Sequence, residues 1–311
     1  MSKRIASIIF ASLMLGALVS CGFERQGDDG TLSVVSTIFA PYDFARAVAS
    51  GLAEVTMLLP PGSESHSYEP TPQDILRIRR CGVFIYVGGE SDAWAERILA
   101  SMDTSNMRIV TLMDCVDTVE EIIVEGMQVD EDDDETELDE HVWTSPKNAI
   151  LITQKISEAM CVADPQNTEA YRQNSESYLN KLDALDAEFQ EIAANGLRNT
   201  IVFGDRFPFR YFADAYGLDY YAAFPGCAAE TEAGAQTVIF LIEKIKAEDI
   251  PAVFHAELSN EQMARAIAKE TGARVLQLHA CHNITVADFR AGKTYLDLMG
   301  ANARALRAAL S

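Results

Sequence analysis

From Leu32 onward, short apolar runs alternate with stretches whose apolar residues recur every three or four positions. The runs predict buried strands, and the 3.6-residue period predicts amphipathic helices between them. In the first half the expected strands are 33–39, 55–59, 83–87 and 108–112, and the expected helices are 43–51, 72–79 and 93–102. In the second half the expected strands are 200–203, 219–223, 252–256 and 274–278, and the expected helices are 208–216, 235–247, 260–271 and 294–309.

One longer helical pattern separates these two halves. Apolar residues recur at spacings of three, four or seven from Tyr171 to Ile192, which indicates one buried helix face. Asp164-Pro165 suits the beginning of this helix, and Gly196 suits its end. A helix of this length could run along both halves and join them stiffly.

The alternation favours an α/β fold of two lobes, each a mainly parallel sheet flanked by helices. We expect an N-terminal lobe at 32–163, a linking helix at 164–196 and a C-terminal lobe at 197–311, with the binding site in the cleft between the lobes. The chain has 311 residues, of which 48% are hydrophobic, so two separate cores can form.

The first twenty residues differ from the rest. Lys3 and Arg4 precede an apolar run that ends at Cys21, as in a bacterial lipoprotein signal peptide. We expect residues 1–20 to be removed, Cys21 to be lipidated and 21–31 to form a flexible tether. An ordinary cleaved signal is the alternative. Either way the protein is exported, and lipidation would hold it on the outer face of the cell membrane.

The net charge of −22 excludes nucleic-acid binding through the general field of the protein. The acid is concentrated in a loop at 125–140, where residues 130–140 read DEDDDETELDE. Such a run cannot pack in a core. It is either a loop that collects cations beside a binding site or a solvated surface, and the sequence does not decide between them.

The metal-binding chemistry lies in the histidines. His66 occurs in a Gly/Pro/Ser loop after a predicted strand, His141 follows the acidic run, and His279 directly follows the strand 274–278. Asp205 follows the strand 200–203 in the same way. Ligands of open α/β sheets bind beyond the carboxyl ends of the strands. Three imidazoles and one carboxylate would form a tetrahedral site suited to zinc.

Neighbouring residues offer alternatives. Cys281 and His282 lie close enough to His279 to replace it as a ligand. Glu257 ends a predicted strand, where it could orient a ligand histidine, and Glu230 could line the cleft.

The cysteines give weaker signals. Five remain after Cys21, so at least one is unpaired if all pairing is internal. The chain has no CxxC motif, which leaves a zinc–thiolate cluster unsupported. Cys227 follows a Pro-Gly turn and could pair with Cys281, or it could be a free buried thiol.

The chain resembles the substrate-binding lipoproteins of bacterial zinc and manganese ABC transporters, the zinc-uptake type of cluster A-I. The resemblance covers nearly all of the mature chain. Its strongest pieces are PGSESHSYEPTP around His66 and EHVWTSPKNA around His141. Further matches in the same order are YFADAYGL, AVFHAE, AKETGARVL and YLDLMGAN. The resemblance implies two α/β lobes joined by one long helix, with His66 and His141 as metal ligands from the first lobe.

The second lobe departs from the family pattern. An ungapped match puts Arg206 at a ligand position, but arginine is permanently charged and cannot bind a cation. Asp205, one residue earlier, is the substitute that we expect. The family usually has Asp where this chain has His279, and this change favours Zn(II) over Mn(II).

The resemblance implies a function without catalysis. We expect a monomer that captures Zn(II) and delivers it to an ABC-transporter permease with its ATPase. A manganese-binding component and a surface adhesin are the alternatives, and a zinc hydrolase is a further alternative from another class.

Overall fold

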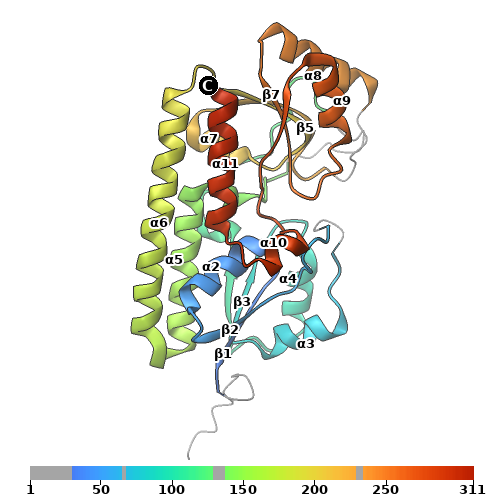
Figure 1. Cartoon of the computed structure of the whole chain (residues 1–311). Coiled ribbons are helices and arrows are strands. Elements are labelled where there is room, and N and C mark those ends of the chain that lie inside the picture. The colour runs from blue at the N-terminus through green and yellow to red at the C-terminus, as the bar shows by residue number, and fades with distance from the viewer. Residues whose placement is uncertain (1–29, 65–67, 129–136, 229–233) are drawn as a thin grey trace, which may run out of the picture.

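The computed structural model describes residues 30–64, 68–128, 137–228 and 234–311. Figure 1 shows two α/β lobes, one above the other, with a long helix beside both. The first lobe holds a four-stranded parallel sheet in the order β2-β1-β3-β4. Its strands are β1 (Leu32–Ser36), β2 (Ala53–Met57), β3 (Val83–Tyr86) and β4 (Arg108–Thr111), and its helices are α2 (Phe39–Ala49), α3 (Pro72–Arg80), α4 (Ala93–Ala100) and α5 (Pro146–Ala163).

The second lobe repeats this architecture. Its parallel sheet has the order β6-β5-β7-β8. The strands are β5 (Thr200–Phe207), β6 (Asp219–Pro225), β7 (Ala252–His255) and β8 (Arg274–Gln277), and the helices are α7 (Arg210–Tyr216), α8 (Ala235–Ala247), α9 (Gln262–Thr271), α10 (Val286–Arg290) and α11 (Tyr295–Leu310). The predicted fold class is therefore confirmed.

The long helix α6 (Thr168–Asn195) follows a 3-10 turn at Pro165–Asn167. It runs beside both lobes in Figure 1. Its apolar residues at spacings of three, four and seven, which include Tyr171, Leu182 and Phe189, are buried. They belong to one continuous core that takes in residues of both lobes. A rigid helix sharing its core with both lobes favours small relative motions of the lobes over wide opening.

Several elements differ from expectation, and helix α10 is one that the sequence did not predict. The strand predicted at 33–39 ends at Ser36 because α2 already begins at Phe39, and Pro41 is tolerated in its first turn. Helix α5 is not among the predicted elements, although its buried residues at 149, 152, 156 and 160 have helical spacing. Strand β5 continues to Phe207 across a register shift between Phe203 and Arg206.

A segment between β8 and α10, residues 279–285, leaves the second sheet and crosses onto the first lobe. We call it the crossing segment. Its backbone binds the first lobe in two places: Phe39 N–H donates to the carbonyl oxygen of His282 at 3.0 Å, and Gly62 N–H donates to that of Ile284 at 2.8 Å. The indole N–H of Trp143 adds a hydrogen bond of 2.7 Å to the carbonyl oxygen of Ala280. In Figure 1 the following helix, α10, accordingly lies against the first lobe.

No helix in the described ranges is both long and apolar enough to cross a bilayer. The expected signal peptide and Cys21 fall at 1–29, outside the described residues.

A buried carboxylate in the first lobe predicts a pH-dependent stability. Asp92 accepts hydrogen bonds from Val87 N–H at 2.7 Å and from the Thr37 hydroxyl at 3.1 Å. Burial nevertheless raises its pKa from 3.8 to about 6. Between about pH 4 and pH 6 the folded protein thus binds more protons than the unfolded chain, and its stability falls as pH rises.

We expect Asp92→Asn to remove this effect, since an amide oxygen can still accept both hydrogen bonds. The pKa difference corresponds to about 3 kcal/mol as an upper limit above pH 6. Denaturant unfolding of the metal-free wild type and variant from pH 4 to pH 7.5 measures the free energy of unfolding at each pH. The variant should match the wild type at pH 4 and exceed it at pH 7.5; equal pH profiles would contradict this account of Asp92.

Candidate metal centre

His141 is the best-defined candidate ligand. It lies at the start of a 3-10 turn (Val142–Thr144) and is 1% exposed. Its Nδ1 lies 3.2 Å from Asp139 Oδ1, and its backbone N–H donates to the same oxygen at 2.8 Å. With Nδ1 directed at a carboxylate, Nε2 is the ring nitrogen that could bind a metal ion, which is the usual arrangement of a metal-ligating histidine.

The charge state of His141 follows from the same contact. Burial lowers its pKa, but the charge and hydrogen bond of Asp139, together with a hydrogen bond to the Cys227 side chain, outweigh burial. The net result is a pKa well above the ordinary 6.5. The contact with Asp139 therefore favours the protonated imidazole, and a metal ion that binds His141 competes with a proton.

The imidazole that meets His141 is that of His282, in the crossing segment. The two ring centroids are 5.5 Å apart and the rings are nearly perpendicular, at 83°. The His282 ring also lies 4.9 Å from the ring of Trp143. The fold thus places the ring of His282 next to that of His141, although the two residues are far apart in sequence.

Glu257 holds the backbone that carries His282. Its two carboxylate oxygens accept hydrogen bonds from the N–H groups of Ala280 at 2.5 Å and of His282 at 3.2 Å. Burial raises the pKa of Glu257 to about 7, although these hydrogen bonds act to lower it. Its contacts are those of a residue that positions the crossing segment.

His279 lies elsewhere. Its backbone N–H donates to Asn302 Oδ1 at 2.7 Å, and its carbonyl oxygen accepts from Asn302 Nδ2 at 2.8 Å. Burial lowers the pKa of its imidazole to about 4, and Asp288, Lys293 and His255 lie near enough to influence that pKa. The contacts of His279 among the described residues are thus with Asn302 and the start of helix α10, whereas a ring contact with His141 is formed by His282.

Cys281, between the two histidines, has a left-handed backbone with φ of 58°. This conformation turns the chain between His279 and His282. The Cys281 side chain is completely buried, and its thiol contacts the carbonyl oxygen of His279 at 3.8 Å.

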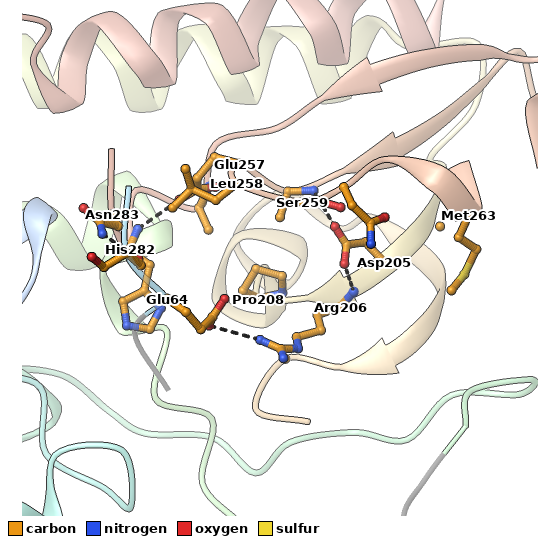
Figure 2. A pocket seen from close by; sticks show the side chains of 16 residues that line it. Glu64, Asp205, Arg206, Pro208, Glu257, Leu258, Ser259, Met263, His282 and Asn283 are labelled. Atoms are coloured by element: carbon orange, nitrogen blue, oxygen red, sulfur yellow. Dashed lines mark hydrogen bonds and ion pairs between the residues drawn. The ribbon is translucent and has the colours of Figure 1, made fainter. Parts of the chain in front are cut away.

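Asp205 is placed within strand β5, at the register shift, and not after the strand. One of its carboxylate oxygens accepts a hydrogen bond from Arg206 N–H at 2.9 Å, and the other accepts one from Ala256 N–H at 3.1 Å. Gly204 lets helix α9 pack closely against this strand, because a Cβ there would lie only 2.8 Å from the Ala264 Cα. In Figure 2 Asp205 and His282 are at opposite ends of the pocket.

The pocket in Figure 2 is a cavity of about 270 Å³ lined by both lobes and the crossing segment. Arg206, which the resemblance aligned with a ligand, extends into it and forms an ion pair of 3.4 Å with Glu64 of the first lobe. This contact connects the lobes across the cavity. A guanidinium group here cannot ligate a cation.

Cys227 is a site residue that the strand-end rule could have found, because it comes just after β6. Its side chain forms a hydrogen bond with His141. Its backbone N–H donates to Glu121 Oε1 at 3.0 Å. Gly226 beside it fits closely, because a Cβ there would lie 3.2 Å from His141 Cε1.

None of the five described cysteines forms a disulfide, so the pairing of Cys227 with Cys281 considered from sequence is not present. His66, Glu230 and residues 130–136 of the acidic run at 130–140 fall outside the described residues. The end of the run is described, and its Asp139 and Glu140 are buried, so the expectation that the whole run cannot pack is wrong there. Across the described residues alone, no group of three or more His, Cys, Asp and Glu side chains is close enough to hold a metal ion.

A family model described as zinc-uptake complex component A, periplasmic, matches residues 34–309. The chain belongs to this family. The family is one of zinc-uptake solute-binding proteins, and two-lobe structures of this type are its structural neighbours. This confirms the resemblance drawn from the motifs around His66 and His141.

Three relatives illustrate the match. The zinc-binding lipoprotein AdcA of Streptococcus pneumoniae is 28% identical over 98% of this chain, but the chain spans only 60% of AdcA. The high-affinity zinc uptake system protein ZnuA of Bacillus subtilis is 27% identical over 92% of this chain and 89% of ZnuA. The crystal structure of the Zn(II)-bound ZnuA-like domain of AdcA is 26% identical, with a TM-score of 0.74 over 90% of this chain and 99% of that domain.

Proposed function

We propose that this chain captures Zn(II) outside the cytoplasm and delivers it to an ABC-transporter permease served by its ATPase. It acts as a monomer, anchored to the membrane by a lipid on Cys21. The observation that carries the proposal is the pair of His141 and His282, with the Nδ1 of His141 held by Asp139. Membership in a zinc-uptake family and a relative crystallised with zinc support the choice of metal.

In this proposal His141, His282 and His66 supply imidazole ligands. The assignment of His66 rests on the family motif around it, and in the sequence His66 comes two positions after the pocket-lining residue Glu64. His282 takes the place expected for His279, because its ring is the one that meets His141. Asp205 faces backbone amides at the other end of the pocket, which argues against a ligand role in this arrangement. Three imidazoles favour zinc over manganese, which prefers oxygen ligands.

The zinc ion is cargo in this scheme, and the protein performs no reaction on it. The ligand-bearing parts are preformed: the crossing segment is hydrogen-bonded to the first lobe, and Glu257 holds its backbone. Capture therefore involves side-chain adjustment and small lobe movements. The permease then recognises the metal-bound arrangement of the two lobes.

A direct test is an equilibrium titration of the metal-free protein with Zn(II) and Mn(II) in competition with a chelator. We expect one zinc per chain, bound at least about 100-fold more tightly than manganese, because imidazole ligands favour zinc. His66→Ala should weaken zinc binding while leaving the fold unchanged by circular dichroism. Unchanged tight binding in that variant would remove His66 from the site, and no stoichiometric zinc in the wild type would refute the function.

A further inference from the structure

Most second-lobe side chains near the pocket are already held by hydrogen bonds or an ion pair, and so are poorly placed to bind a metal ion. Asp205 and Glu257 both accept backbone hydrogen bonds through both of their carboxylate oxygens. Arg206 is a permanent cation paired with Glu64. The imidazole of His282 lies against the first lobe, because the crossing segment is bound there. A second-lobe ligand must therefore come from another position.

Cys227 meets this requirement. It directly follows the Pro-Gly turn at the carboxyl end of β6, and its thiol contacts the His141 ring. Since Nδ1 of that ring faces Asp139, the nitrogen available to the thiol is Nε2. A hydrogen-bonded nitrogen and sulfur are separated by about the distance, roughly 3.5 Å, between two ligands of a tetrahedral zinc ion with Zn–N near 2.0 Å and Zn–S near 2.3 Å.

We propose that Cys227 is the ligand that the second lobe contributes to the transported zinc ion, bound through its thiolate together with His141 and His282. These three side chains are not close enough to hold a metal ion as they stand, so they must draw together around the ion when it binds. This inference rests on the proposed function and names a residue of the same site. Zinc replaces the hydrogen bond between Cys227 and His141 with one bond to each side chain, and the displaced protons go to solvent.

Two contacts keep Cys227 in place. Its backbone N–H donates to Glu121 Oε1, and Glu121 comes from the first lobe's chain before the acidic run. Gly226 lets the turn approach the His141 ring closely, because a Cβ at this position would lie 3.2 Å from His141 Cε1. The thiolate ligand is thus positioned by a contact between the two lobes, so zinc binding at Cys227 would strengthen the closed arrangement. A sulfur ligand also discriminates against manganese and magnesium, which prefer oxygen.

X-ray absorption spectroscopy at the zinc edge on the stoichiometric zinc complex of the full chain tests this inference. We expect one sulfur neighbour at about 2.3 Å together with nitrogen neighbours at about 2.0 Å. Cys227→Ser should remove the sulfur signal and weaken zinc binding at least about tenfold, in line with the loss of one ligand. Cys161→Ser is the matched control. It removes a thiol at the end of α5, and it should change neither the sulfur signal nor the zinc affinity.

The outcomes separate the two proposals. Tight stoichiometric zinc with only nitrogen and oxygen neighbours in the wild type would overturn the role of Cys227 and leave the proposed function intact. Absence of stoichiometric zinc would overturn both. The wild-type spectrum alone decides the point if Cys227→Ser does not fold.

Discussion

Replacing His282 with alanine is expected to reduce zinc affinity at least about 100-fold, whereas His279→Ala changes it by no more than about threefold. The binding free energy of a four-ligand zinc site is roughly 10–16 kcal/mol, so each ligand accounts for about 3 kcal/mol. A substitution that touches no ligand usually changes free energies by about 0.5 kcal/mol. The prediction rests on where the two residues lie. The His282 ring packs against the His141 ring, whereas the described hydrogen bond of the His279 backbone is to Asn302.

The two variants are well matched, since both remove an imidazole from the crossing segment and leave its backbone hydrogen bonds in place. Chelator competition at pH 7.5 measures the affinities, and thermal unfolding of the metal-free proteins checks the fold. A large loss in His279→Ala with little loss in His282→Ala would restore the assignment expected from sequence and refute the one made from the structure.

Zinc affinity is expected to fall as pH drops from 7.5 to 5.5. His141 has a pKa raised well above 6.5, so below that pKa each pH unit costs about tenfold in affinity through proton competition at this residue alone. The sign is fixed, because zinc binds only the deprotonated Nε2 and acid favours the imidazolium. Other imidazole ligands would steepen the fall.

Asp139→Asn provides the control for this pH dependence. An amide oxygen can still accept the His141 backbone N–H, but it cannot stabilise an imidazolium by its charge. The pKa of His141 should therefore drop, and the loss of zinc affinity between pH 7.5 and pH 5.5 should become smaller. Chelator competition at several pH values measures both slopes. Parallel curves for the two proteins would mean that the Asp139 contact does not govern metal binding.

The fold could be predicted largely from sequence because buried parallel strands are continuous apolar runs. Strand β3 is such a run, and helix α8 has the predicted bounds. The errors arise where tertiary packing overrides the local pattern. Strand β5 continues past Gly204 through a register shift, and this extension puts Asp205 inside the strand, where its carboxylate binds backbone amides.

The site was less predictable because the backbone conformation of a single residue can decide which neighbouring side chain points towards the site. His279 and His282 are three positions apart, and both follow β8. The left-handed turn at Cys281 and the carboxylate of Glu257 decide which ring reaches His141. Neither effect has a sequence signature. Cys227 did have one, its position at the end of β6, but its contact with His141 joins residues 86 positions apart and appears only in the folded chain.

A crystal structure of the full chain with bound zinc, combined with elemental analysis of the protein as purified, tests the central claim most directly. The account predicts one zinc ion per chain, ligated by His141 Nε2 and by His282, with Asp139 still bound to His141 Nδ1. Zinc bound to His279 or Asp205 with His282 at a distance, or a metal ion located away from His141, would contradict it.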